Sequence, residues 1–362
     1  MHSGVSETFA FVRQEFWIMG SRNIIRKTIH QCHQCFMQRR ITSQQIMGDL
    51  PSYRIQPNRP FTNTGLDYAG PLTIRLSRCR NAKTSKAYIA FFVCMTTKAI
   101  HLELVNDLTT DAFIAAFRRF VSRRGKCSIV YSDNGTNFQG ARRCLTEMHK
   151  LVMEQSHNDV ITDALAKDGI AWHFIPPSSP HFGGLWEAGV KSVKLHLRRV
   201  IGKSILTFEE LCTLLCQVEA ILNSRPLCSM SDCNLNPLTP AHFLVGQPMK
   251  AVIEPSHLDT PINRLSHWNH IQNMVQGFWK RWHTEYLTTL QERPKWQRST
   301  PNFKSGDLVV IKEPNLPPTK WILGRVVSVH PGTDQQVRVV TVKTAAGTFI
   351  RLIAKLALLP TS

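Results

Sequence analysis

The sequence contains no long uncharged apolar segment and no signal for export. No run of roughly 18 or more apolar residues is present, which excludes a transmembrane helix. The start, MHSGVSETFAFVRQEFW, lacks the basic and then apolar order of a signal peptide, so we do not expect secretion. Internal repeats and low-complexity tracts are also missing. An apolar content of 43% argues against a largely disordered chain.

Acidic residues are few in comparison with basic ones. The 362 residues include 25 Asp and Glu against 44 Lys and Arg, and the formal charge is +19. The positive excess is spread along the chain and is not confined to a tail. Such a distribution favours long contact with a polyanion, and nucleic acid is the commonest one. Ten cysteines without an export signal indicate reduced thiols or metal ligands, not a disulfide framework.

The order of predicted elements is that of a mixed α/β protein with flanking segments. Residues 1–40 show helical spacing of apolar residues and end in the motif CHQC, and a proline-containing linker follows. The central part has the order β, β, β, α, β, α, β, α, α. Residues 265–293 predict one long helix with a buried tryptophan stripe. Short strands in 304–359 predict a small β-barrel.

Three acidic residues stand at the ends of predicted elements beside turn residues. We expect Asp67 to end a strand before the Gly-Pro pair at 70–71, and Asp133 to end the strand CSIVYSD. We expect Glu187 in the first turn of a helix after the Gly-rich loop at 183–184. Oxygen ligands suit hard cations such as Mg²⁺, and two ions on shared carboxylates can support phosphodiester chemistry. The alternative is that each is an ordinary surface or capping acid.

The sequence around these acids resembles the integrases of retroviruses and LTR retrotransposons, most closely those of the BEL/Pao group. The resembling segments are GLDYAGPL around Asp67, SDNGTNFQGA around Asp133 and WHFIPPSSPHFGGLWEAGVKSVK around Glu187. The resemblance covers nearly the whole chain. It implies an α/β protein: a ribonuclease-H-like integrase core with an N-terminal helical zinc-binding-like segment and a C-terminal SH3-like β-barrel.

The resemblance also implies domain boundaries. Residues 1–50 would be the zinc-binding-like segment, which we expect to be truncated, and residues 51–230 the catalytic core. Residues 231–300 would be a linker and long helix, and residues 301–362 the SH3-like barrel. The gap from the second acid to the third is longer than in typical retroviral integrases, and residues 157–168 look like part of an insertion.

By this resemblance Asp67, Asp133 and Glu187 form a D,D,E triad that binds two Mg²⁺ or Mn²⁺ ions. Asp67 would bridge both ions, and the other two acids would each complete one site. The implied reactions are cleavage near the 3′ end of the element's DNA by water and then attack of the new 3′-hydroxyl on target DNA. Positioning and charge stabilisation would supply the catalysis, without a protein nucleophile.

Basic residues accompany the predicted site. Lys191 and Lys194 fall on the same helix face as Glu187, Arg198 continues that stripe, and the resemblance places DNA-end contacts there. A solvated helix face is the alternative. A cluster of arginines at 118–124 would complement a helix dipole or form a DNA or partner surface. In the barrel, basic residues with Trp321 suit either DNA contact or a protein–protein module.

The CHQC motif resembles part of the His-His-Cys-Cys zinc module of integrases. By that resemblance His2, Cys32 and Cys35 would be ligands of Zn²⁺, which would hold together a segment too small for its own core. The family pattern needs a further His before His2. The sequence therefore leaves two interpretations open. In the first, the segment binds zinc, and if the chain is not truncated His30 or His33 replaces the missing His ligand. In the second, the segment is helical and metal-free, with two buried thiols.

The leading hypothesis is a retroelement integrase, a polynucleotidyl transferase. We expect it to act as a homo-oligomer on double-stranded DNA, which includes the element ends and the target. We expect it in the nucleus, with the cytoplasm as a second location, and not at a membrane. The alternative is a domesticated, catalytically inactive DNA-binding protein derived from such an integrase. A third reading is a structural partner within integrase-like oligomers. Retention of all three acids favours the enzyme. DNA affinity that survives loss of the acids and of divalent metal would distinguish the inactive readings.

Overall fold

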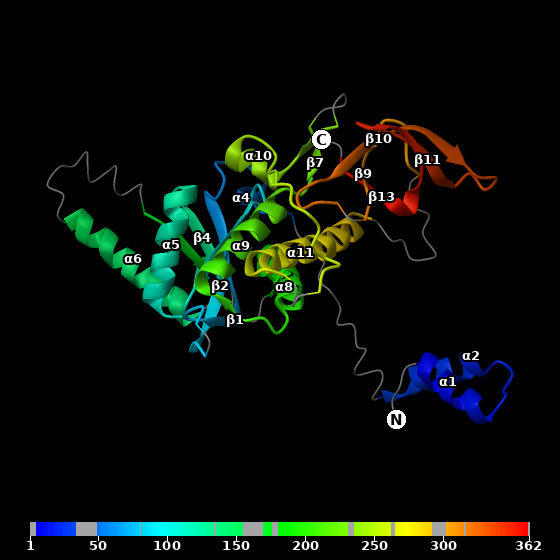
Figure 1. Cartoon of the computed structure of the whole chain (residues 1–362), viewed down its shortest axis with the longest axis horizontal. Coiled ribbons are helices and arrows are strands. Elements are labelled where there is room, and N and C mark those ends of the chain that lie inside the picture. The colour runs from blue at the N-terminus through cyan, green and yellow to red at the C-terminus, as the bar shows by residue number, and fades with distance from the viewer. Residues whose placement is uncertain are drawn as a thin grey trace. The chain divides into compact units, whose positions relative to one another are not determined.

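The computed structural model places most of the chain in two compact units, Met1–Pro51 and Ser52–Ser362 (Figure 1). It describes residues 5–33, 49–79, 81–133, 135–154, 169–175, 180–230, 235–261, 265–291, 302–314 and 316–360. The expected insertion at 157–168 lies outside the described residues. Among those described, no helix is long and apolar enough to cross a bilayer.

The N-terminal unit contains two helices, as the apolar spacing predicts. They are α1 (Val5–Glu15) and α2 (Ser21–Gln31), and Gly20 between them adopts a left-handed φ of 71°, which favours glycine. The Arg13 guanidinium lies over the rings of Phe9 and Trp17. Ser21 is the only buried residue in these two helices. The described part of this unit therefore has no hydrophobic core of its own.

The second unit is built around a mixed sheet. Its strands are β1 (Asn63–Arg75), β2 (Thr84–Cys94), β3 (Ile100–Val105), β4 (Ile129–Ser132), β5 (Ala171–Phe174) and β6 (Leu206–Thr207). The order is β3-β2-β1-β4-β5, with β6 beside β1. The first three strands are antiparallel, and β4 and β5 run parallel to β1. The predicted α/β class is confirmed, and the strand order is that of a ribonuclease-H-like fold.

Helices cover both faces of this sheet (Figure 1). On one face, α5 (Thr110–Arg124) and α6 (Thr136–Glu154) contribute to a core rich in phenylalanine. On the other face lie α8 (Pro180–Ile201), α9 (Phe208–Asn223) and α11 (His267–Leu290), which share a second core with β1 and β2. Short elements complete the unit: α4 (Ser52–Ile55), β7 (Cys228–Ser229), β8 (Pro237–Leu238) and α10 (Pro240–Val245).

The C-terminal region forms a second, five-stranded antiparallel sheet that is consistent with an SH3-like domain. Its strands are β9 (Leu308–Ile311), β10 (Ile322–Pro331), β11 (Val337–Thr344), β12 (Gly347–Leu352) and β13 (Leu356–Leu358), with the 3₁₀ turn η2 (Ile353–Lys355) before the last. The order is β12-β11-β10-β9-β13. The short strands predicted over residues 304–359 are present. The three-residue strand β13 was not predicted.

Trp321 joins this sheet to α11, so its expected role in a DNA-facing surface is wrong. Its ring packs edge-on against Trp279 at 5.0 Å and against Tyr286 at 5.6 Å between centroids. Its Nε1 donates a hydrogen bond to Ser224 Oγ at 3.1 Å. The predicted buried stripe of α11 is confirmed, since Trp279 and Trp282 are 2% and 6% exposed. Trp321 therefore stabilises the contact between α11 and the C-terminal sheet.

Candidate active site and basic helix

Two of the three candidate acids lie next to each other on neighbouring parallel strands. The pairing of β1 with β4 places Leu66 opposite Ser132; Asp67 is the next residue of β1, and Asp133 directly follows β4. Neighbouring strands are about 4.8 Å apart. The register therefore places the backbones of Asp67 and Asp133 side by side.

The two-residue alternation of strands assigns both acids to the face that α8 covers. Asp67 is two residues before Ala69, and Asp133 is two residues after Tyr131. Ala69 and Tyr131 belong to the core that also contains Val190, Val193 and Leu197 of α8. Side chains two residues apart on a strand point to the same side. The acids therefore face the layer in which α8 lies.

Local hydrogen bonds hold the backbone around both acids. Asp67 is half-buried, and its Oδ1 accepts a hydrogen bond from the Tyr68 amide at 2.6 Å. Asp133 is exposed, and its Oδ1 accepts from the Gly135 amide at 3.1 Å. The fully buried Ser132 accepts from Trp172 Nε1 at 2.9 Å. One acid is thus embedded in the sheet, and the other begins the turn that follows it.

Two expectations about the surroundings of the acids are wrong. Asp67 does not end a strand, because β1 continues through the Gly-Pro pair at 70–71 to Arg75. A register shift between Ala69 and Leu72 carries the pairing past the proline, which has no amide hydrogen to donate. The segment 183–184 is not a loop, since α8 already begins at Pro180. Proline is favoured at the first helical position.

Glu187 is therefore in the second turn of α8, not the first. Its backbone belongs to the helix, while its side chain lies outside what the structure describes. Its position is one turn before the buried Val190 and one turn before the exposed Lys191. The structure brings Asp67 and Asp133 together and places the third acid's helix over the same face of the sheet.

Helix α8 is fixed to α11 by polar contacts as well as by packing. Glu285 of α11 accepts hydrogen bonds from Ser192 Oγ at 2.7 Å and pairs with His196 Nε2 at 2.6 Å. Burial would raise the pKa of Glu285, but these two hydrogen bonds outweigh burial and lower it. The His196 ring is 3% exposed. These contacts hold the helix that carries Glu187 against the rest of the core.

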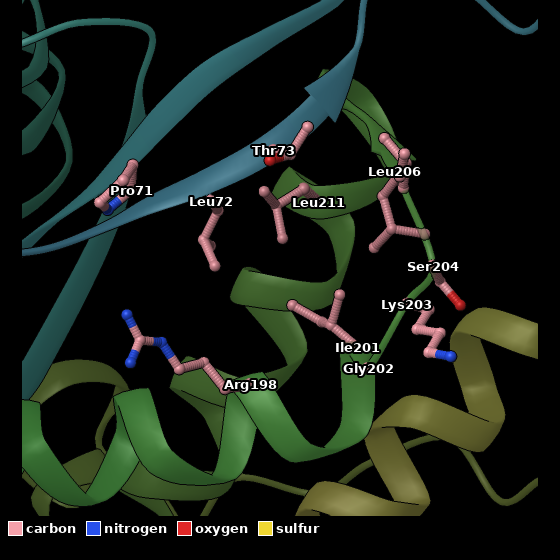
Figure 2. A pocket seen from close by; sticks show the side chains of 11 residues that line it. Pro71, Leu72, Thr73, Arg198, Ile201, Gly202, Lys203, Ser204, Leu206 and Leu211 are labelled. Carbon is pink, nitrogen blue, oxygen red and sulfur yellow. The ribbon is translucent and has the colours of Figure 1, made fainter.

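The predicted basic stripe is present on α8. Lys191 and Arg198 are exposed and Lys194 is half-buried. Arg198 lines a pocket of about 350 Å³ between the end of α8 and the second half of β1 (Figure 2). The figure shows Leu72, Ile201 and Leu211 around its interior. Arg198 is eleven residues from Glu187, or about 17 Å along a helix, so the stripe extends well beyond the acids.

The arginines at 118–124 belong mainly to a buried ionic network that the sequence did not reveal. Glu103 of β3 is 5% exposed and accepts hydrogen bonds from Arg119 Nε at 2.7 Å and from Arg123 at 3.0 Å. Arg124 pairs with Glu219 of α9. His101 lies between the two carboxylates, 3.2 Å from Glu103 and 3.1 Å from Glu219.

The network shifts the pKa values of His101 and Glu103 in the direction that favours their charged forms. Burial alone would lower the pKa of His101, but its hydrogen bonds to Glu103 and Glu219 outweigh burial and raise it. Burial would raise the pKa of Glu103, but hydrogen bonds from His101 and Arg119 lower it. Three of the arginines thus pair with carboxylates of the fold, a role that the sequence did not indicate. Arg123 and Arg124 also lie in the last turn of α5, as the dipole-complementing interpretation expects.

The zinc prediction falls largely outside the described residues. Cys32 is the residue after α2, has an extended backbone and is half-buried, whereas His2 and Cys35 are not described. Within the described ranges no three His, Cys, Asp or Glu side chains form a metal-binding group, so His30 and His33 do not complete such a group around Cys32. A thiol at the end of a coreless helical pair fits the donor chemistry of a stabilising zinc site.

Comparisons with known proteins point to retroviral Pol proteins. Residues 1–40 match the family model for the integrase zinc binding domain, and residues 266–359 match a family of unknown function (DUF5641). The Pro-Pol polyprotein of simian foamy virus type 3 (strain LK3) is 24% identical over 203 residues. That match includes 55% of this chain and 15% of the polyprotein, so the chain spans a small part of its relative.

Solved integrase structures are also similar. The intasome of simian T-cell lymphotropic virus in complex with PP2A regulatory subunit B56 gamma matches 99% of this chain and 96% of that chain, with 13% identity and a TM-score of 0.35. The HTLV-2 integrase catalytic core domain in complex with magnesium, in its trimeric form, matches 51% and 97%, with 16% identity and a TM-score of 0.32. Because both TM-scores are low, the fold assignment depends on the strand order. The family model and the polyprotein match support a relationship to the retroviral integrase superfamily.

Proposed function

We propose that this protein is a retroelement integrase of the BEL/Pao type, which processes DNA 3′ ends and joins them to target DNA. The observation that carries the proposal is the register of β1 and β4, which puts Asp67 and Asp133 side by side beneath the helix of Glu187. The match of residues 1–40 to the integrase zinc binding domain supports it independently.

The three acids are the proposed metal ligands. Their carboxylate oxygens are the donors that Mg²⁺ and Mn²⁺ prefer. Two such ions, when bound, supply the charge that activates the attacking oxygen and stabilises the leaving oxygen of a phosphodiester. Asp67, Asp133 and Glu187 would together hold these ions.

The basic stripe of α8 is the proposed contact with the DNA end. Lys191 and Lys194 are four and seven residues after Glu187 and so follow the same helix face. Phosphate contacts fix the position of a duplex without reading its sequence. The contacts of Ser192 and His196 with Glu285 keep that face in place relative to the acids. DNA bound along α8 would therefore present a phosphate to the carboxylates.

The remaining parts of the proposal concern partners and location. Double-stranded DNA, as element ends and as target, is the proposed substrate, and joining two ends requires a multimer. The N-terminal unit would bind Zn²⁺ through His2, Cys32 and Cys35 in the full site. Reaction with chromosomal DNA places the protein in the nucleus. An inactive DNA-binding derivative remains the competing function and is separated from the enzyme by the experiment below.

The experiment is a strand-transfer assay with the full chain, a short labelled DNA end, a plasmid target and Mn²⁺. Glu187→Gln removes one proposed ligand with almost no change in volume. We expect it to abolish joined products while DNA-end binding, measured by fluorescence anisotropy, stays within a few-fold. Glu209→Gln, an exposed acid in the first turn of α9, is the matched control and should retain activity. Normal joining by Glu187→Gln would refute the triad, and tight binding without any product from the unaltered protein would favour the inactive derivative.

A further inference from the structure

Three aromatic rings form a continuous stack on the face of the sheet that carries the acids. Tyr53 of α4 stacks on Tyr131 of β4, with ring centroids 4.7 Å apart and planes at 30°. Tyr131 stacks in turn on His173 of β5, at 5.5 Å and 21°. The proposed catalytic chemistry uses none of these rings, and the pattern of the sequence did not single them out.

The aromatic stack is displaced from the two aspartates by two residues along the strands. Strand pairing aligns Gly65, Tyr131 and His173 across β1, β4 and β5. Asp67 lies two residues further along β1, and Asp133 is two residues after Tyr131, immediately beyond the end of β4. Two strand residues span about 6.6 Å. That length is close to two stacked nucleotides at roughly 3.4 Å each.

One end of the stack is fixed and the other is open. Tyr53 and Tyr131 are half-buried against the core that contains α8, and the Tyr53 carbonyl accepts a hydrogen bond from Thr96 Oγ1 at 3.1 Å. His173 is exposed, and β5 is the last strand of the sheet. Such a stack holds the imidazole in one orientation and leaves its outer side accessible.

We propose that His173, supported by Tyr131 and Tyr53, is a stacking platform for an unpaired nucleobase beside the reacting phosphate. An aromatic ring accepts every base because each base has a π face, so contact of this kind is tolerant of sequence. The proposal rests on the proposed function, since it assumes that a DNA end reaches Asp67 and Asp133. It adds a preference for ends whose last bases are unpaired.

The preference for unpaired ends can be measured as a difference in binding affinity. Base stacking on an aromatic side chain is strong enough that its removal weakens binding by about fivefold or more. The full chain should therefore bind a duplex with a two-nucleotide single-stranded end at least about fivefold more tightly than a blunt duplex. His173→Ala should remove this difference without changing the affinity for the blunt duplex, because phosphate contacts are untouched.

The test uses 2-aminopurine, whose fluorescence is quenched by stacking, at the unpaired end of such a duplex. Anisotropy reports binding and quenching reports the platform, both in EDTA so that no reaction occurs. We expect quenching with the unaltered protein and with His173→Tyr, and loss of quenching with His173→Ala. His330→Ala, which alters an exposed histidine of β10, is the matched control and should quench normally.

The two proposals fail in different ways. Equal quenching and equal end preference in His173→Ala would overturn the platform and leave the integrase proposal standing. No binding of any DNA end by the unaltered chain would overturn both. Loss of quenching in His173→Ala with intact binding of the blunt duplex would support the platform whether or not strand transfer is observed.

Discussion

Replacement of Glu103 by glutamine tests how strongly the buried ionic network holds β3 against α5. Glu103 is 5% exposed and accepts hydrogen bonds from His101, Arg119 and Arg123. Glutamine has nearly the same volume but no charge, and its amide group presents hydrogens to the arginine donors. The substitution therefore removes the electrostatic partner and leaves the packing in place.

The loss of unfolding free energy depends on whether the positively charged partners of Glu103 can reach water or another carboxylate. Removing one partner of a buried ion pair costs about 3–5 kcal/mol, because the other charge remains buried. The side chains of Arg119 and Arg123 are 42% and 56% exposed, so both can turn toward water. His101 is 2% exposed but retains Glu219. We therefore expect a loss near the lower limit, about 3 kcal/mol of unfolding free energy.

The loss should depend on pH in a defined direction. The pKa of His101 is raised above 6.5, so its contribution is complete below that pH and disappears as the pH rises through the raised value. The pKa of Glu103 is lowered below 4.5, so its contribution is complete above that pH and disappears as the pH falls through the lowered value. The difference between the two proteins should be largest between pH 4.5 and 6.5.

Urea denaturation at pH 6, followed by circular dichroism, measures this difference. Glu209→Gln, an exposed acid on α9, is the control and should change stability by less than about 0.5 kcal/mol. A loss below about 1 kcal/mol in Glu103→Gln would refute the reasoning, because it would show that the network contributes no more than surface pairs do. A difference that grows above pH 8 would contradict the assigned charge of His101.

Three further predictions follow from the same structure. Lys194→Glu should weaken DNA-end binding and make the slope of log K against log salt shallower by about one unit, as measured by anisotropy; an unchanged slope would remove Lys194 from the DNA contact. Trp321→Ala should lower the free energy of unfolding, measured by urea denaturation, by about 3 kcal/mol, because Trp321 packs on Trp279. The control Trp268→Ala alters a side chain that is 49% exposed and should cost less than about 1 kcal/mol. Equal losses would contradict the role of Trp321 in joining the C-terminal sheet to α11. Cys32→Ser should lower the zinc content found by atomic absorption, and unchanged zinc would exclude Cys32 as a ligand.

Local signals in the sequence were enough to predict several elements. The bounds of α5 follow from Thr109, whose side chain accepts a hydrogen bond from the Ala112 amide, and from Gly125, whose φ of 83° ends the helix. Both signals act within a few residues of the helix ends. The acids Asp67 and Asp133 were likewise indicated by the motifs around them, although only the strand register shows that they are neighbours.

Other features depend on contacts between distant segments and could not be read locally. β1 continues past Pro71 because the ladder with β2 shifts its register, which is a property of the pair of strands. The three-residue β13 exists because it pairs with β9, since so short a run carries no periodicity. Glu103 carries no local signal of its role, because the arginines that pair with it come from α5.

The central claim is that Asp67 and Asp133 are paired metal ligands of a DNA-joining enzyme. The most direct measurement is strand transfer by the full chain with Mn²⁺, compared with Asp133→Asn under the same conditions. We expect joined products from the unaltered protein, none in EDTA and none from Asp133→Asn, with DNA-end binding preserved within a few-fold. Joined products from Asp133→Asn at the normal rate would contradict it.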